Sequence, residues 1–140
     1  MIETANYLKK NGIRPSEQRV RIYEYLSSRK NHPTADMIYS ALAPKMPTLS
    51  KATVYNTLKR FISQGVAMPV MIEENEIRYD ADTHLHGHFK CDICGKIFDF
   101  SSEFPKLQTS EMKNFLITEQ HIYLKGICKF CRKKEEDSKN

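Results

Sequence analysis

The chain has 140 residues, of which 22 are lysine or arginine and 17 are aspartate or glutamate. This length suffices for one sizeable core, or for two small domains that a partner stabilises. No run approaches the ~18 apolar residues that a membrane span requires, and the N-terminus lacks the basic start and apolar run of a secretory signal. We therefore expect a cytoplasmic protein without a membrane partner.

The positive charge is uneven along the chain. Residues 1–75 hold 11 basic and 6 acidic side chains, whereas residues 76–140 hold 11 of each. The excess therefore lies in the first part, where we expect a polyanionic partner, although many unrelated proteins are equally basic.

Helical signals fill the first 64 residues. Residues 3–11 predict a short helix, and Ser16 is a candidate cap for a second helix that runs to about Ser28. Thr34 caps a third helix over residues 35–42, after a break at the preceding proline.

A fourth helix begins after Ser50 and runs from Lys51 to about Gln64. Helical spacing predicts a buried stripe through Val54 and Leu58. The opposite surface keeps polar side chains, among them Lys51, Thr53, Asn56 and Thr57.

Two alternating segments follow, 66–72 and 76–79, and predict a β-hairpin. Helices followed by a hairpin are the order of a winged helix, in which the capped helix before the wing enters the major groove. A helical bundle with a solvated polar face is the alternative.

The second part predicts strands around 84–90, 96–100 and 122–127, with a helix over 106–116. The tail 132–140 is expected to be solvated and disordered. We therefore predict an α+β protein, with a winged-helix DNA-binding domain over 1–79 and a dimerisation and metal-regulatory domain over 80–140. The exposed faces of the small second sheet are expected to bury in a twofold dimer.

The cysteines occur only as two CxxC pairs, Cys91/Cys94 and Cys128/Cys131. In a chain without an export signal, such pairs favour a metal site over disulfides. Four thiolates complete a closed tetrahedral shell, which is typical of structural zinc. Redox-active cysteines are the alternative. A zinc hydrolase or deaminase would need an open coordination position and a nearby acid/base glutamate.

Potential ligands recur at every second position before Cys91. If this segment is extended, the five side chains share one face, and Cys91 points to the other. The pattern predicts a second site, of imidazole and carboxylate ligands, that suits Fe, Mn, Co, Ni or Zn. The five residues are Asp80, Asp82, His84, His86 and His88.

Over about residues 5–132 the chain resembles the ferric uptake regulator family. The matching pieces are Arg14–Arg19, His32–Asp36, Ser50–Tyr55 followed by Leu58, Arg78–Asp80, His86–His88, Cys91–Gly95 and Cys128–Cys131. The resemblance implies a homodimeric, non-enzymatic repressor that binds double-stranded operator DNA with an inverted repeat when metal is loaded.

The resemblance also implies roles for individual residues. Zn²⁺ is held by Cys91, Cys94, Cys128 and Cys131. The regulatory ion, Fe²⁺ or Mn²⁺, is held by His32, Asp80, His86, His88 and Asp99. DNA contacts are expected from Arg19, Lys51, Thr53, Tyr55 and Asn56, although Tyr55 could instead be a core aromatic.

Asp99 stands where iron-sensing members usually have glutamate, which resembles the peroxide-sensing branch. That branch implies oxidation of His32 and His86 by peroxide, with metal and peroxide as the only small molecules involved. An iron- or zinc-responsive uptake regulator is the alternative, and a zinc-stapled interaction module is a further one. Gln120 stands where many iron sensors have histidine, so we expect no second imidazole–carboxylate site of their type.

Overall fold

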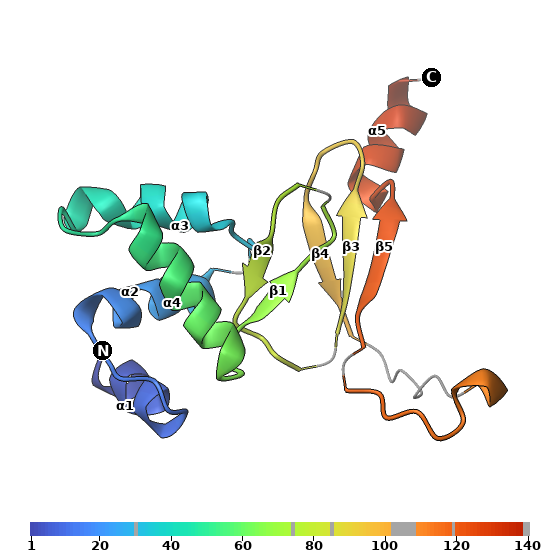
Figure 1. The fold of residues 1–140 in the computed structure, drawn as a ribbon. Helices are drawn as coiled ribbons and strands as arrows, with labels where there is room; N and C mark the ends of the chain where they lie inside the picture. Colours follow the sequence, from blue (N-terminus) through green and yellow to red (C-terminus); the bar gives the residue numbers. More distant parts are fainter. Residues whose placement is uncertain (30, 74, 85, 102–108, 119, 139–140) are drawn as a thin grey trace. The chain divides into compact units, whose positions relative to one another are not determined.

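The computed structural model describes residues 1–29, 31–73, 75–84, 86–101, 109–118 and 120–138. The chain divides into an N-terminal unit, Met1–Thr83, and a C-terminal unit, His84–Asn140. Each unit combines helices with a small sheet, which confirms the α+β prediction (Figure 1). Within the described residues, no helix is long and apolar enough to cross a bilayer.

Among its described residues the N-terminal unit opens with four α-helices, and three of them begin at the expected caps. The hydroxyl oxygens of Ser16, Thr34 and Ser50 each accept a hydrogen bond of 3.1 Å from the backbone N–H three residues later. Such caps satisfy N–H groups that have no partner within the helix. The helices are α1 (Ile2–Lys10), α2 (Glu17–Ser28), α3 (Ala35–Leu42) and α4 (Lys51–Ser63), and the 3-10 turn η1 (Ala43–Lys45) follows α3.

The four helices enclose one apolar core. Leu8, Ile22, Ile38 and Phe61 are fully buried in it, and each such side chain contributes roughly 1.5–3 kcal/mol. Thr57 is also buried, at 4% exposure, so the prediction of an exposed Thr57 is wrong. It lies four residues before Phe61, and helical periodicity therefore places it on the buried face.

A two-stranded antiparallel hairpin completes the N-terminal unit. It pairs β1 (Met68–Val70) with β2 (Arg78–Asp80), and Met68 lies opposite Asp80. The backbone N–H of Tyr79 donates to the carbonyl of Pro33 at 3.0 Å, so β2 is attached to the segment that leads into α3. The order of helices and hairpin is that of a winged helix.

In the C-terminal unit, β3 is the central strand of three. β3 (Gly87–Cys91) pairs antiparallel with β4 (Ile97–Phe100) and parallel with β5 (Ile122–Gly126). Because β5 runs parallel to β3, both cysteine pairs arise at the same end of the sheet.

Two expectations for the C-terminal unit are wrong. The described part of the expected helix, residues 109–116, holds only the 3-10 turn η2 (Ser110–Met112), and residues 106–108 lie outside the described residues. Asn114 has a φ of 69°, and Leu116 is 89% exposed. The segment therefore buries no apolar stripe that would stabilise a helix.

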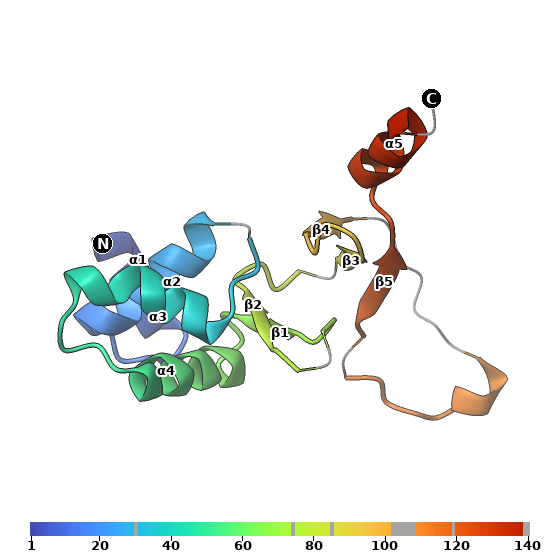
Figure 2. The same ribbon diagram turned by 90° about the horizontal axis from the view of Figure 1, so that it is seen from above.

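Residues 132–138 of the tail expected to be disordered belong instead to α5 (Lys129–Ser138), which continues the chain beyond β5 in both ribbon views (Figures 1 and 2). Residues 139–140 lie outside the described residues. The first turn of α5 contains Cys131, whose N–H donates to the sulfur of Cys128 at 3.5 Å. This contact helps to fix the first helical turn, the costly step in helix formation. The lysines, arginine and glutamates that follow are good helix formers.

Gly87 allows a close approach within this sheet. It pairs with Phe100 of β4, and a Cβ atom at position 87 would overlap the Phe100 ring. The backbone of β3 therefore has no room for a side chain at this position.

Candidate metal centres and DNA-binding helix

The sheet of the C-terminal unit gathers all four cysteines. Cys91 ends β3, and Cys94 follows in a turn where Gly95 has a φ of 74°, a conformation that suits glycine. Cys128 follows β5, and Cys131 lies in the first turn of α5. The four Sγ atoms all lie within 4.8 Å of one another.

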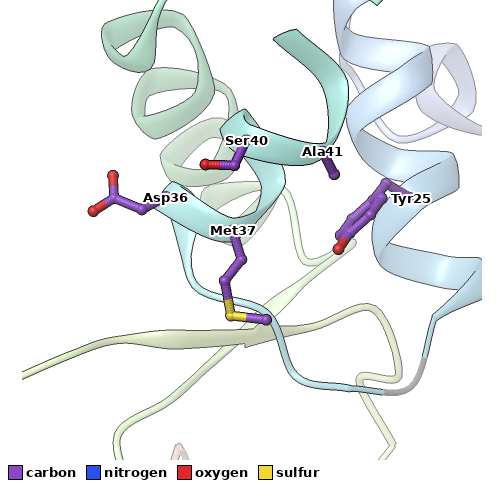
Figure 3. A pocket seen from close by; sticks show the side chains of 5 residues that line it. All are labelled: Tyr25, Asp36, Met37, Ser40 and Ala41. Atoms are coloured by element: carbon purple, nitrogen blue, oxygen red, sulfur yellow. The ribbon is translucent and has the colours of Figure 1, made fainter. Parts of the chain in front are cut away.

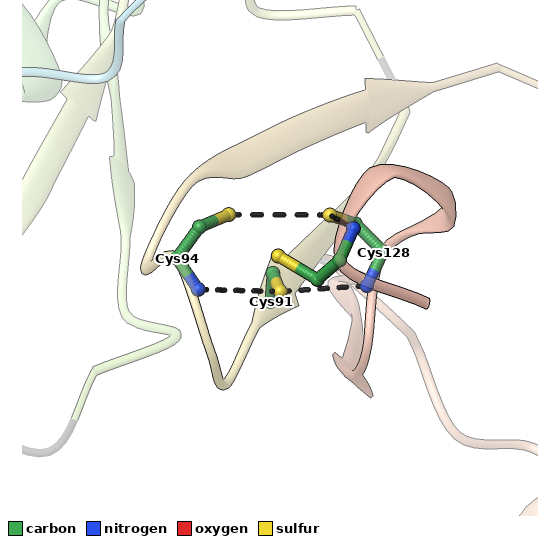
Figure 4. Close-up of side chains that lie close together, drawn as sticks. Cys91, Cys94 and Cys128 are labelled. Carbon is green, nitrogen blue, oxygen red and sulfur yellow. Dashed lines mark hydrogen bonds between the residues drawn. The ribbon is translucent and has the colours of Figure 1, made fainter. Parts of the chain in front are cut away.

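The geometry of this cluster suits zinc. The Sγ atoms of Cys94 and Cys128 lie 3.9 Å apart, close to the ~3.8 Å edge of a tetrahedron with Zn–S bonds of ~2.3 Å. The backbone N–H groups of Cys94 and Cys128 donate to the sulfur of Cys91 at 3.5 and 3.4 Å (Figure 4). Such donors stabilise a thiolate, and four thiolates leave no open coordination position.

The cysteines differ in their affinity for protons. The N–H donors of Cys128 and Cys94 lower the pKa of Cys91 from 9.0 to about 6. Burial, reinforced by the neighbouring thiols, raises the pKa of Cys131 to about 12. A bound dication deprotonates its thiol ligands, so zinc binding here is coupled to proton release.

A second set of ligand atoms in the C-terminal unit consists of two histidines and one carboxylate. The Nε2 atoms of His86 and His88 lie 3.7 and 3.4 Å from the same Oδ1 of Asp99. The Nδ1 of His86 lies 2.6 Å from the carbonyl oxygen of His84, which can only accept a hydrogen bond. In the neutral ring Nδ1 therefore carries the proton, and Nε2 keeps the lone pair that a metal needs.

A smaller set lies within the N-terminal unit. The Nε2 of His32 lies 3.4 Å from Oδ2 of Asp80. This separation exceeds the ~2.7–3.2 Å of ordinary N–H···O hydrogen bonds. It falls within the ~3.0–3.6 Å expected between neighbouring ligands whose bonds to a metal are ~2.0–2.2 Å. Imidazole and carboxylate together suit iron and manganese.

The alternating run before Cys91 does not form one extended strand. Asp80 ends β2, His88 lies in β3, and the exposed Asp82 and His84 lie between the strands. The backbone N–H of Asp82 donates to Oδ1 of Asp80 at 2.9 Å, a local turn that interrupts the extended chain. The expectation of five ligands on one face of one strand is therefore wrong.

Strand geometry does separate the thiolate ligands from the imidazole and carboxylate ligands. His88 and Cys91 are three residues apart in β3, so they project from opposite faces of the sheet. The thiolate cluster and the His86–His88–Asp99 set are therefore distinct within this unit.

Arg78, for which the sequence predicted no role, contacts the backbone of a candidate ligand. Its Nε lies 2.6 Å from Oε1 of Glu73, and its Nη1 donates to the carbonyl oxygen of His32 at 3.1 Å. The available signal was its place in the Arg78–Asp80 motif, two residues before a candidate ligand.

The candidate DNA-binding residues lie on α4 and α2. On α4, Lys51, Tyr55 and Asn56 are exposed, and Tyr55 is 46% exposed rather than part of the core. Thr53 is half-buried, and its hydroxyl lies 2.9 Å from that of Ser50. Arg19 on α2 is half-buried, and its Nη1 donates to the Arg14 carbonyl at 2.9 Å.

Net charge does not distinguish the two units. When the chain is divided after Thr83, the N-terminal unit holds 12 basic and 9 acidic residues, and the C-terminal unit holds 10 and 8. The excess expected in the first part thus depends on where the chain is cut. The exposed side chains of α4 are a better guide to DNA than the net charge is.

A surface hollow of about 490 Å³ lies beside α3 and is lined by Tyr25, Asp36, Met37, Ser40 and Ala41 (Figure 3). It contains a single carboxylate and no histidine or cysteine. These side chains do not form a nucleophile–base pair or a metal site.

Comparisons with known proteins identify relatives over most of the chain. Residues 10–125 match the model of the ferric uptake regulator family. The chain is 39% identical over 135 residues to the peroxide-responsive repressor PerR of Staphylococcus epidermidis, and the match covers 93% of this chain and 89% of that protein. The corresponding repressor of Staphylococcus aureus is also 39% identical, over 137 residues, with 94% and 91% covered.

Solved structures show the same fold. The ferric uptake regulator of Vibrio cholerae has a TM-score of 0.69 at 27% identity, with 89% of this chain and 98% of that chain covered. PerR from Streptococcus pyogenes has a TM-score of 0.53 at 33% identity, with 92% and 90% covered. The chain therefore belongs to the ferric uptake regulator family of metal-responsive repressors.

Proposed function

We propose that this repressor senses hydrogen peroxide and binds an inverted-repeat operator as a homodimer in the cytoplasm. The observation that carries the sensing proposal is the pair of histidines around Asp99, whose Nε2 atoms both face its carboxylate. The similarity to two peroxide-responsive repressors supports the choice of signal. The protein would act as a regulator and not as an enzyme.

We further propose that the regulatory ion takes ligands from both sets. His32 and Asp80 offer two donors, and His86, His88 and Asp99 offer three. Fe²⁺ and Mn²⁺ favour higher coordination numbers than either set provides alone. An ion that needs all five residues would restrict how the two units move, and would so favour one spacing of the two recognition helices in the dimer.

Loss of the ion would then lower the population of dimers that can bind DNA. When bound, Fe²⁺ supplies the one-electron chemistry that cleaves the O–O bond of peroxide. In the net reaction one oxygen atom is added to the imidazole of His32 or His86, and the other leaves as water. An oxidised ring is a poorer ligand, so metal and operator are released.

Mass spectrometry tests this proposal. Zinc-replete protein is loaded with Fe²⁺, or with Mn²⁺ as control, and treated with low-micromolar peroxide. We expect a one-oxygen gain at His32 or His86 with iron only, together with lost operator affinity. The exposed His84 lies in the same tryptic peptide as His86 and serves as an internal control.

The tryptic peptide that contains His32 also contains Met37, whose sulfur gains the same mass when oxidised. Fragment ions must therefore place the oxygen on the histidine. Unmodified His32 and His86, with operator binding that follows metal supply alone, would instead identify an iron- or zinc-responsive uptake regulator.

A further inference from the structure

Arg78 connects three parts of the N-terminal unit through one guanidinium group. Its Nε contacts the Glu73 carboxylate at 2.6 Å, and its Nη1 donates to the His32 carbonyl at 3.1 Å. The Arg78 and Glu73 side chains are only 19% and 17% exposed. A planar guanidinium presents these two donors at a fixed angle, which the single ammonium of lysine cannot reproduce.

His32 has a backbone conformation that needs support. Its φ is 50°, in the left-handed region that non-glycine residues rarely adopt. It also precedes Pro33, and a residue before proline prefers an extended conformation. Strained residues of this kind persist only where their surroundings hold them in place.

The contacts around His32 come from β2. A bridge pairs Thr34 with Arg78, and the Tyr79 N–H donates to the Pro33 carbonyl at 3.0 Å. Asp80, the next residue of β2, places its carboxylate 3.4 Å from the His32 ring. Strand β2 therefore carries Asp80, one candidate ligand, and also holds the backbone of His32, the other.

We infer that Arg78 is a positioning residue for the regulatory metal: anchored by Glu73, it holds the His32 backbone so that the imidazole faces Asp80. This inference rests on the proposed function, because it takes His32 to be a metal ligand. Arg78 itself does not touch the metal.

The test compares Mn²⁺ affinities of zinc-replete variants. Residues that orient metal ligands typically change affinity by about 10–100-fold, so we expect Arg78→Lys to weaken Mn²⁺ binding about tenfold. Arg60→Lys is the matched control, since Arg60 also donates to a backbone carbonyl, that of Gly12, at 3.0 Å. Arg60→Lys should bind Mn²⁺ like the parent protein.

A second readout separates positioning from general loss of structure. In the iron and peroxide experiment, Arg78→Lys should lower oxidation of His32 relative to that of His86, which lies in the other unit. General unfolding would lower both together. Glu73→Gln, which weakens the anchor by removing its charge without altering Arg78, should also weaken Mn²⁺ binding even if Arg78→Lys folds poorly.

Parental Mn²⁺ affinity in both Arg78→Lys and Glu73→Gln, or an equal loss in Arg60→Lys, would overturn the inference. His32→Ala distinguishes failure of the proposed function. If it leaves Mn²⁺ affinity unchanged, His32 is not a ligand and the proposed ligand set is wrong. If it weakens Mn²⁺ binding while the Arg78 and Glu73 variants do not, only the positioning role is wrong.

Discussion

His88 and Asp99 lie directly opposite each other in the ladder between β3 and β4, with Nε2 and Oδ1 3.4 Å apart. Side chains directly opposite in an antiparallel pair share one face of the sheet. The pairing register of β3 and β4 therefore places the His88 imidazole beside the Asp99 carboxylate, eleven residues later in the chain. A shift of register by one residue would turn one of the two side chains to the other face.

Removing the Asp99 carboxylate should weaken the regulatory site without affecting the zinc site. We expect Asp99→Ala to raise the dissociation constant for Mn²⁺ at least about tenfold, because the two imidazoles lose their common acidic partner. Isothermal titration on zinc-replete protein would measure this. Glu111→Ala removes an exposed carboxylate of the same unit and should bind Mn²⁺ like the parent protein. Equal affinities for the two variants would refute the role of Asp99.

Loss of one zinc ligand should destabilise the C-terminal unit. Serine does not supply the thiolate that zinc binds, and structural zinc contributes ~10–16 kcal/mol in small zinc-binding peptides. We therefore expect Cys128→Ser to purify without zinc and to show a lower melting temperature for this unit. Zinc content and circular dichroism would report both effects. Lys129→Ser, at the exposed neighbouring residue, should retain zinc and the parental melting temperature.

The stability of the zinc-free protein should rise with pH between about 6 and 9. In that window Cys91, with its pKa lowered from 9.0 to about 6, is a thiolate in the folded protein and a thiol in the unfolded chain. The unfolded state then binds more protons, so the Cys91 contribution is full above pH 9 and is lost below about 6.

Cys131 does not contribute to this pH dependence of stability. Its pKa is raised to about 12, so it is protonated in both the folded and the unfolded state below pH 9. Urea midpoints across this window would measure the effect. In Cys91→Ser the urea midpoint should not rise with pH across this window. If it still rises, another group causes the pH dependence.

The exposed residues of α4 should contribute to DNA binding in different ways. We expect Tyr55→Ala to cost roughly 1–3 kcal/mol on operator DNA and little on unrelated DNA, as for a base contact. Lys51→Ala should weaken binding to both DNAs. It should also reduce the slope of the logarithm of the binding constant against the logarithm of the salt concentration by about one. Fluorescence anisotropy at several salt concentrations would measure both.

Neither substitution should lower the melting temperature much, because both side chains are exposed. Lys134→Ala, in the exposed part of α5, is the charge-matched control for Lys51→Ala and should leave operator binding and its salt dependence unchanged. An equal effect of this variant would mean that Lys51 acts only through net charge.

Local signals predicted the N-terminal unit well. Ser16, Thr34 and Ser50 cap the helices that were expected to begin there, because capping depends on atoms only three residues apart. Regular helical spacing correctly predicted Val54 and Leu58 as core residues. Thr57 is the exception, because its polar side chain favours the surface but its position on the helix faces the core.

The C-terminal unit was harder to predict because its structure depends on distant partners. The helix expected around Met112 is reduced to one 3-10 turn, and the first turn of α5 holds Cys131, whose partners lie in β3 and beyond. The alternation from Asp80 to His88 gave no sign of the turn made by the Asp82 N–H. The contact of Arg78 with the His32 carbonyl spans 46 residues, which sequence spacing alone cannot predict.

Gly87 lies between two candidate ligands, His86 and His88, and directly under the ring of Phe100. Any larger residue there would push β4 away from β3, and Asp99, next to Phe100, would move with it. The absence of a side chain thus sets how near the carboxylate can come to the imidazoles. A saturation mutagenesis screen would find Gly87 as intolerant of substitution as the metal ligands are, although Gly87 has no atom that binds metal.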